Sequence, residues 1–204
     1  IDPDKPSVVF VGRITRQKGL PYFLRAAAQL PPEVQVVLCA GAPDTPQIMA
    51  EVEGLVRDLQ TRRDGVVWID EFLQRDQLCA ILTSATTFVC PSVYEPLGIV
   101  NLEAMACGAA VVGTATGGIP EVVVDGVTGR LVPIEQVQDG TGTPIDPERF
   151  VADLAAALTE VVSDPERARA YGEAGRQRAA TEFSWQAIAD ATAALYREVA
   201  TTGR

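Results

Sequence analysis

Short, valine-rich apolar runs alternate along this chain with stretches of helical periodicity. The runs occupy residues 8–11, 34–39, 66–69, 86–90, 109–113 and 130–132. Between them, the apolar residues of 20–30, 47–62, 75–83 and 98–106 recur at the spacing of an amphipathic helix. Strands that alternate with helices in this way form parallel sheets. The pattern therefore predicts an α/β protein with a parallel sheet of about six strands.

Several of the predicted strands are apolar at successive positions rather than at every second one, as in residues 8–11. A strand of this kind has helices on both faces, so we expect a doubly wound sheet. The polar stretch 135–147 is predicted to be a loop. Helical periodicity resumes in 150–162, 165–181 and 185–199, with Asp164 and Ser184 as suitable N-caps for the last two helices. A chain of 204 residues is sufficient for one such domain.

The charge balance disfavours polyanionic partners. The chain has 17 basic and 27 acidic residues, a formal charge of −10, which would repel nucleic acid and anionic membranes. It has no histidine, so the most common general base and metal ligand at neutral pH is missing, and we expect no metal site. No apolar run reaches the ~18 residues of a membrane span, and the first residues lack the apolar core of a signal peptide. Residues 1–6 resemble a linker within a longer protein.

Four cysteines are spread along the chain without any C-x-x-C pair: Cys39, Cys79, Cys90 and Cys107. This spacing is typical of buried free thiols in a reducing compartment. We therefore expect a cytoplasmic protein.

Open α/β sheets bind ligands beyond the carboxyl ends of their strands, so the loops that follow the strands are the informative ones. The first, residues 12–19, offers Arg13, Arg16 and Lys18 where a helix is about to begin. It matches neither the dinucleotide fingerprint nor the P-loop, so any anion would be bound by charge. A bidentate arginine and a mobile lysine suit a diphosphate. Considered alone, these cations are equally compatible with a solvated surface.

The loop after the fourth strand, within residues 91–108, carries the most information. Glu95 precedes a predicted helix in which Pro96 suits the first position, and Gly98 and Ile99 would present free amides at the positive end of the dipole. Glu103 follows Glu95 by eight residues, up to ~12 Å along a helix. That separation suits two ends of one elongated ligand better than paired acid and base catalysis. Alternatively, Glu103 is a helix carboxylate favoured by the dipole.

The loop after the fifth strand, residues 114–121, contains two adjacent glycines. They permit a close backbone approach to a ligand, and they equally suit a plain connection between strand and helix.

Together these motifs resemble the C-terminal domain of the GT-B glycosyltransferases of family 4 over essentially the whole chain. The resemblance rests on Gly-Arg-x4-Lys-Gly at 12–19, on the E-x7-E pair of Glu95 and Glu103, on the loop 114–121 and on Phe-Ser-Trp at 183–185. Within that family the chain is most similar to glycogen synthases of the actinobacterial type, through residues 40–46 and 94–101.

The resemblance implies that residues 1–204 are the nucleotide-sugar-binding domain. Arg13 and Lys18 would neutralise the donor diphosphate as its bond to the sugar breaks, and Glu95 would contact the transferred sugar. The implied substrate-binding residues are Leu97, Gly98 and Ile99 for the phosphate or sugar, Glu103 for the ribose, and Phe72 and Leu73 for the nucleobase.

The implied reaction is retaining transfer of glucose from ADP-glucose or UDP-glucose to an α-glucan or a short glucosyl phosphate, with no metal and no cofactor. The acceptor site would belong to an N-terminal domain that is absent here, so we expect this chain alone to be inactive. The helix at 184–200 would cross back to that domain. In this chain alone, its apolar surface would be exposed.

Two other functions remain open at this stage: a non-enzymatic nucleotide-binding module, and a family 4 enzyme with another acceptor. A Rossmann-type dehydrogenase is disfavoured because no glycine fingerprint follows the first strand. The residues leave the nucleobase of the donor undecided.

Overall fold

A single parallel sheet organises the molecule, as the alternating pattern predicts. The computed structural model describes residues 1–202, and in these the strands lie in the order β3-β2-β1-β4-β5-β6, with every neighbouring pair parallel. The strands are β1 (Ser7–Arg13), β2 (Gln35–Gly41), β3 (Val66–Ile69), β4 (Thr87–Cys90), β5 (Ala110–Thr114) and β6 (Gly129–Val132). The order reverses between β1 and β4, which makes the carboxyl ends of these two strands the expected place for a ligand.

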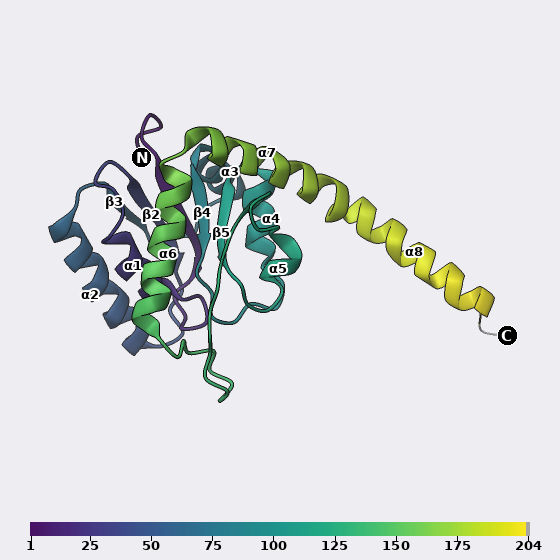
Figure 1. Ribbon diagram of the computed structural model, residues 1–204, viewed down its shortest axis with the longest axis horizontal. Helices are drawn as coiled ribbons and strands as arrows, with labels where there is room; N and C mark the ends of the chain where they lie inside the picture. The colour runs from purple at the N-terminus through teal and green to yellow at the C-terminus, as the bar shows by residue number, and fades with distance from the viewer. Residues whose placement is uncertain (203–204) are drawn as a thin grey trace.

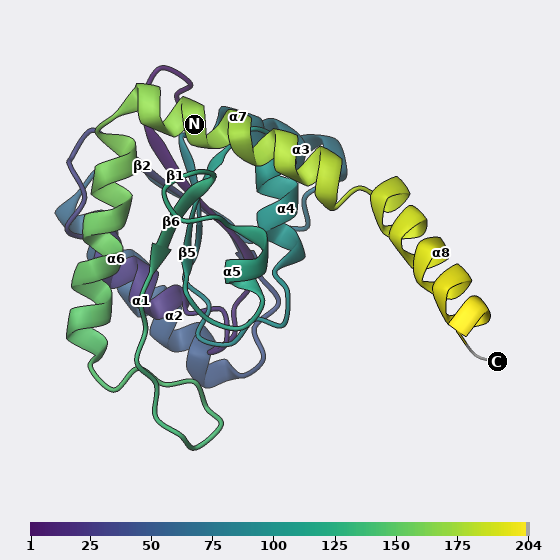
Figure 2. The same cartoon turned by 45° about the vertical axis from the view of Figure 1, so that its right-hand side comes forward.

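Helices cover both faces of the sheet (Figures 1 and 2). On one face pack α1 (Leu20–Ala27), α2 (Pro46–Arg62) and α6 (Pro147–Val162). On the other pack α3 (Arg75–Ser84), α4 (Ile99–Ala106) and α5 (Ile119–Val122). Helix α7 (Pro165–Glu182) contributes residues to both layers, and α8 (Trp185–Thr202) follows it. The predicted doubly wound fold is confirmed.

The central strands are apolar at successive positions because both of their faces are buried. In β1, Val8 and Phe10 pack in the layer of α1, whereas Val9 packs in the layer of α4. The Phe10 ring also stacks on Phe23 of α1 at 6.3 Å between centroids. Full burial of such a side chain contributes about 1.5–3 kcal/mol, so these positions anchor the strand that leads to the first loop.

The predicted caps at the start of the last two helices are confirmed. The Asp164 carboxylate accepts from the amide of Arg167 at 3.0 Å, and the Ser184 hydroxyl accepts from the amide of Ala187 at 3.2 Å. Helix α5 was not predicted, because a helix of four residues is too short to show a period.

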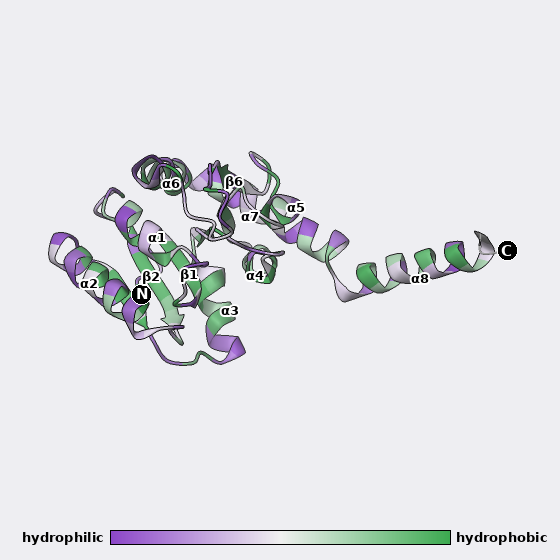
Figure 3. Ribbon diagram, turned by 90° about the horizontal axis from the view of Figure 1, so that it is seen from below, coloured by the Kyte–Doolittle hydropathy of each residue, from purple (hydrophilic) through white to green (hydrophobic). Residues whose placement is uncertain are grey.

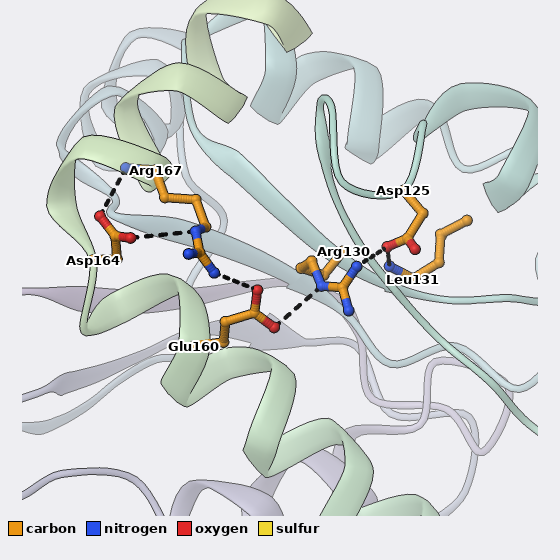
Figure 4. A network of polar contacts seen from close by, with 6 residues as sticks. All are labelled: Asp125, Arg130, Leu131, Glu160, Asp164 and Arg167. Atoms are coloured by element: carbon orange, nitrogen blue, oxygen red, sulfur yellow. Dashed lines mark hydrogen bonds and ion pairs between the residues drawn. The ribbon is translucent and has the colours of Figure 1, made fainter.

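A chain of ion pairs joins the edge strand β6 to the junction of α6 and α7 (Figure 4). Arg130 binds Asp125 at 2.7 Å and Glu160 at 3.3 Å, and Glu160 also binds Arg167 at 2.6 Å. Arg167 in turn lies 3.3 Å from Asp164. These side chains are partly exposed, so each pair stabilises the fold only modestly, but the network fixes the edge of the sheet against its helical cover.

Helix α8 extends away from the rest of the domain (Figure 1). One of its faces is apolar, as the hydropathy colours of Figure 3 show, and Trp185, Leu195 and Tyr196 are exposed on it. The predicted exposure of apolar surface in this helix is therefore present in the structure.

The cysteines are free, but the prediction that all four are buried is wrong. Cys39 and Cys90 are buried in the sheet and Cys107 is half-buried, whereas Cys79 is exposed. Cys79 lies on α3, whose short amphipathic pattern buries only Leu82 fully, so most of this helix faces solvent.

Candidate functional site

The loops that follow β1 and β4 lie against each other at the point where the strand order reverses. The Val93 amide donates to the Gln17 carbonyl at 2.8 Å. Gly19, the N-cap of α1, has φ of 66°, and a Cβ there would lie 1.9 Å from the Pro91 carbonyl oxygen. Only glycine permits both this conformation and this approach. The start of α1 is thereby fixed against the β4 loop, with Lys18 directly before the N-cap.

Lys18 and Glu95 form an ion pair across the two loops. The Lys18 ammonium lies 2.6 Å from Glu95 Oε2, and the side chains are 27% and 9% exposed. The Ser92 hydroxyl donates to the same oxygen at 3.2 Å. A carboxylate this deeply buried requires such charge-assisted bonds. The structure therefore brings together two of the three residues predicted to act on the donor.

Helix α4 begins at Ile99, three residues later than the prediction that placed Pro96 in its first position. The cause is Gly98, which has φ of 85° and so adopts a left-handed conformation that cannot continue a right-handed helix. Gly98 is instead the N-cap, and no side chain caps the helix start. The amides of the first turn, beginning with Ile99, remain as the positive end of the helix, next to Glu95 in the chain.

The two glycines in the loop after β5 pack against the backbone of the β4 loop. A Cβ on Gly117 would lie 1.9 Å from the Glu95 carbonyl oxygen, and one on Gly118 would lie 2.3 Å from that of Pro96. The Gly118 amide also donates to the Glu95 carbonyl at 2.9 Å. The close backbone approach expected of this pair is thus made to the β4 loop, which it holds in place.

Arg13 and Arg16 turn toward other acidic residues. Arg13 lies 3.0 Å from Asp44 and is largely exposed, and Arg16 lies 3.2 Å from Glu51. Neither arginine has an ion pair with Glu95 among the described residues. Of the three predicted cations, Lys18 alone is held at the junction of the loops.

A pocket of about 500 Å³ opens beyond the carboxyl ends of β1, β2 and β3. Arg13 lines it, as do Phe72 and Leu73, the residues predicted to lie near the nucleobase. Lys18 and Glu95 do not line it. Gly12 connects the two regions, because it lines the pocket and its Cβ would lie 3.8 Å from Lys18 Cγ.

The remaining predicted residues lie at the surface of the β4 loop and α4. Leu97, Ile99 and Glu103 are exposed, whereas Gly98 is buried. Ile99 is 65% exposed, so most of its side chain lies outside the core. Glu103 lies about one turn after Ile99, the first residue of α4.

Sequence reasoning missed Asn101, in the first turn of α4. Its side chain is fully buried, and neither its amide nitrogen nor its carbonyl oxygen has a hydrogen-bond partner in the part of the chain that the structure describes. Leaving such a group unsatisfied costs about 1–3 kcal/mol. The signal in the sequence is a single polar residue within the apolar run 99–102.

Two buried thiols lie near these loops and are inert at neutral pH. Burial raises the pKa of Cys39, which lines the pocket, to about 11. Burial also raises the pKa of Cys90, whose sulfur lies 3.6 Å from the Ser92 hydroxyl. Because the thiolate is the reactive form, neither cysteine is a nucleophile under ordinary conditions.

Within residues 1–202, no cluster of three or more acidic or cysteine side chains is arranged to hold a metal ion. No helix in the same range is long and apolar enough to cross a membrane.

The model of the glycosyl transferases group 1 family matches residues 1–178. This chain belongs to that family. Among curated relatives, alpha-maltose-1-phosphate synthase of Mycolicibacterium smegmatis is 54% identical over 199 residues, which are 98% of this chain and 49% of the relative. Glycogen synthase of Mycobacterium tuberculosis is 36% identical over 196 residues, which are 93% of this chain and 42% of the relative. The chain spans about half the length of these relatives.

Solved structures confirm the architecture of a GT-B C-terminal domain. Sucrose-phosphate synthase from Thermosynechococcus elongatus superimposes with a TM-score of 0.78 at 34% identity, over 99% of this chain and 47% of that one. The separately crystallised C-terminal domain of the group 1 glycosyl transferase LpcC from Francisella tularensis has a TM-score of 0.70 at 24% identity, over 88% of this chain and 87% of that domain. The predicted resemblance to the C-terminal domain of GT-B glycosyltransferases is therefore confirmed, and the relatives are glycosyltransferases.

Proposed function

We propose that this domain binds the nucleotide-sugar donor of a retaining glycosyltransferase, which transfers glucose from a nucleoside diphosphate glucose to a glucosyl phosphate. The observation that carries the donor part is the ion pair of Lys18 and Glu95 beside the uncapped start of α4. The Asn101 amide already donates to the Gly98 carbonyl, so the free amides are those of Ile99 and Val100. A cation and free helix amides that flank one point form a site for a diphosphate.

The proposed chemistry requires the leaving nucleoside diphosphate to be stabilised as its negative charge grows. Lys18 supplies a mobile positive charge, and the first-turn amides of α4 supply a fixed dipole. Arg13, which is exposed on the same loop, exchanges Asp44 for a phosphate oxygen when the donor binds. Glu95 accepts hydrogen bonds from hydroxyls of the transferred glucose, and a metal ion is not needed.

The rest of the donor extends in both directions from the diphosphate. The ribose hydroxyls bind the Glu103 carboxylate, and the base enters the pocket lined by Phe72 and Leu73. The pocket volume of about 500 Å³ is sufficient for either a purine or a pyrimidine. Leu97, Gly98 and Ile99 contribute backbone groups at the phosphate and sugar.

The acceptor is proposed from the relatives. The relative at 54% identity is named for the synthesis of α-maltose 1-phosphate, a disaccharide phosphate whose formation from a glucose donor requires glucose 1-phosphate as acceptor. The glycogen synthase at 36% identity supports a second candidate, an α-glucan acceptor. In both cases an α-linked donor gives an α-linked product, so the anomeric configuration is retained.

The acceptor site is proposed to lie outside this domain, in the part of the relatives that this chain does not span. The exposed apolar face of α8 is proposed to pack against that part, since Trp185 and Tyr196 would otherwise remain in water. The isolated chain should then bind the donor without transferring the sugar.

The test uses a full-length protein in which this chain is joined to the part of a relative, such as the alpha-maltose-1-phosphate synthase of Mycolicibacterium smegmatis, that it does not span. The full-length protein is incubated with ADP-glucose or UDP-glucose and either glucose 1-phosphate or glycogen, and the products are followed by phosphorus NMR and by release of nucleotide. We expect α-maltose 1-phosphate with the first acceptor. Transfer to glycogen alone would replace the first candidate with the second, and transfer to neither would refute both.

A further inference from the structure

Asn101 is a buried polar residue that the proposed chemistry has not used. It occupies the third position of α4, and its backbone amide donates to the Gly98 carbonyl at 2.9 Å. Its side-chain amide is inside the protein, with no hydrogen-bond partner among residues 1–202. An apolar side chain at this position would leave no unsatisfied polar group, so packing alone does not explain why asparagine is present.

The side-chain amide lies beside Glu95, separated from it only by the bare Cα of Gly98. The position that a Gly98 Cβ would occupy is 2.4 Å from Asn101 Nδ2 and 3.3 Å from Glu95 Cγ. Both side chains therefore approach the same small space, which the absent Cβ leaves open. A side chain at position 98 would separate them.

Buried Glu95 has the Lys18 ammonium as the ion-pair partner of its carboxylate. Its carboxylate is 9% exposed, and its recorded partners are the Lys18 ammonium and the Ser92 hydroxyl, both on Oε2. When a diphosphate draws Lys18 away, the carboxylate keeps a single neutral donor. A buried carboxylate in that condition is strongly destabilised unless another donor reaches it.

We propose that Asn101 is a positioning residue, whose amide N–H donates to the Glu95 carboxylate when the donor substrate takes Lys18. The bond holds Glu95 in place while it accepts from the glucose hydroxyls. The unsatisfied amide of the free protein is the consequence of keeping that donor ready. This inference rests on the proposed function, because it requires Glu95 to bind the sugar and Lys18 to bind the diphosphate.

The test compares Asn101→Leu with the unaltered chain in calorimetric titrations of a nucleoside diphosphate and of the corresponding nucleoside diphosphate glucose. We expect the affinity for the sugar-bearing ligand to fall about three- to tenfold, the size of one hydrogen bond, while the affinity for the nucleoside diphosphate stays the same.

The double variant with Glu95→Gln isolates the coupling. If Asn101 acts through Glu95, adding Asn101→Leu to Glu95→Gln should not reduce the affinity for the sugar nucleotide further. Asn101→Ser provides a second route, since its short side chain cannot reach Glu95 and should reproduce the loss if the leucine variant fails to fold.

An unchanged ratio of the two affinities would overturn the inference while leaving the proposed function intact. A lower melting temperature with an unchanged ratio would show that Asn101 contributes only to the packing of α4, and would overturn the inference equally. Absence of any nucleotide binding by the unaltered chain would refute the proposed function, and this inference with it.

Discussion

Lys18→Ala is the substitution whose consequences the structure defines most fully. It removes the ammonium group that lies 2.6 Å from Glu95 Oε2 and leaves a carboxylate that is 9% exposed with the Ser92 hydroxyl as its remaining recorded partner. Two separate losses follow, one in the stability of the free chain and one in the affinity for a diphosphate.

The loss of stability depends on how well water can replace the ammonium. Breaking a fully buried pair costs about 3–5 kcal/mol. The Lys18 side chain is 27% exposed, so water can enter the vacated space, and we expect about 1–3 kcal/mol instead. Urea denaturation measures this change. Glu95→Gln in the same chain should recover most of the loss, because it removes the charge left without a partner.

The loss of affinity follows from the missing charge-assisted bond to the diphosphate, worth about 1.5–3 kcal/mol. This corresponds to a roughly ten- to 150-fold increase in the Kd for ADP, measured by titration calorimetry. Glu95→Gln should not restore this affinity. Lys5→Ala is the matched control, because Lys5 is the only other lysine and lies before β1, at the amino end of the sheet. Unchanged ADP affinity in a folded Lys18→Ala chain would refute the assigned role.

Other predictions concern the frame of the site. Gly19→Ala should destabilise the chain by about 2–5 kcal/mol in urea denaturation, because at φ of 66° its Cβ would lie 1.9 Å from the Pro91 carbonyl oxygen. Gly54→Ala, at an exposed position inside α2, should instead stabilise the chain by about 1 kcal/mol. Equal effects of the two substitutions would contradict the packing argument. Alkylation by iodoacetamide at pH 8, followed by mass spectrometry, should modify exposed Cys79 well before Cys39. Burial raises the pKa of Cys39 from 9.0 to about 11. The contribution of this thiol to the free energy of unfolding is therefore fully present below pH 9 and is lost as the pH rises through about 11. Equal labelling rates at pH 8 would show that this thiol is not protected.

The sheet could be predicted because its signal is local. Each buried strand is a run of valine and related residues, and the predicted and observed strand ends agree to within two residues. The predicted end of β1 was two residues short, because Gly12 and Arg13 extend the strand by pairing with β2 and not by being apolar. Similarly, the start of α4 is set by Gly98, whose left-handed conformation is not indicated by Pro96 two residues earlier.

The pairing of Lys18 with Glu95 is not a local property, and the sequence could only suggest it. The two residues are 77 positions apart, and they meet because β1 and β4 are neighbours in the sheet. The burial of Asn101 likewise depends on how α4 packs. Conversely, the sequence did not reveal that Arg13 pairs with Asp44, since that contact depends on the local course of the loop after β2.

The most direct test of the donor site is a crystal structure of this chain soaked with ADP and, in parallel, with UDP. We predict a diphosphate between the Lys18 ammonium and the first-turn amides of α4, with the ribose at Glu103 and the base in the pocket of Phe72 and Leu73. A nucleotide bound elsewhere, with Lys18 still on Glu95 and the start of α4 untouched, would contradict this prediction.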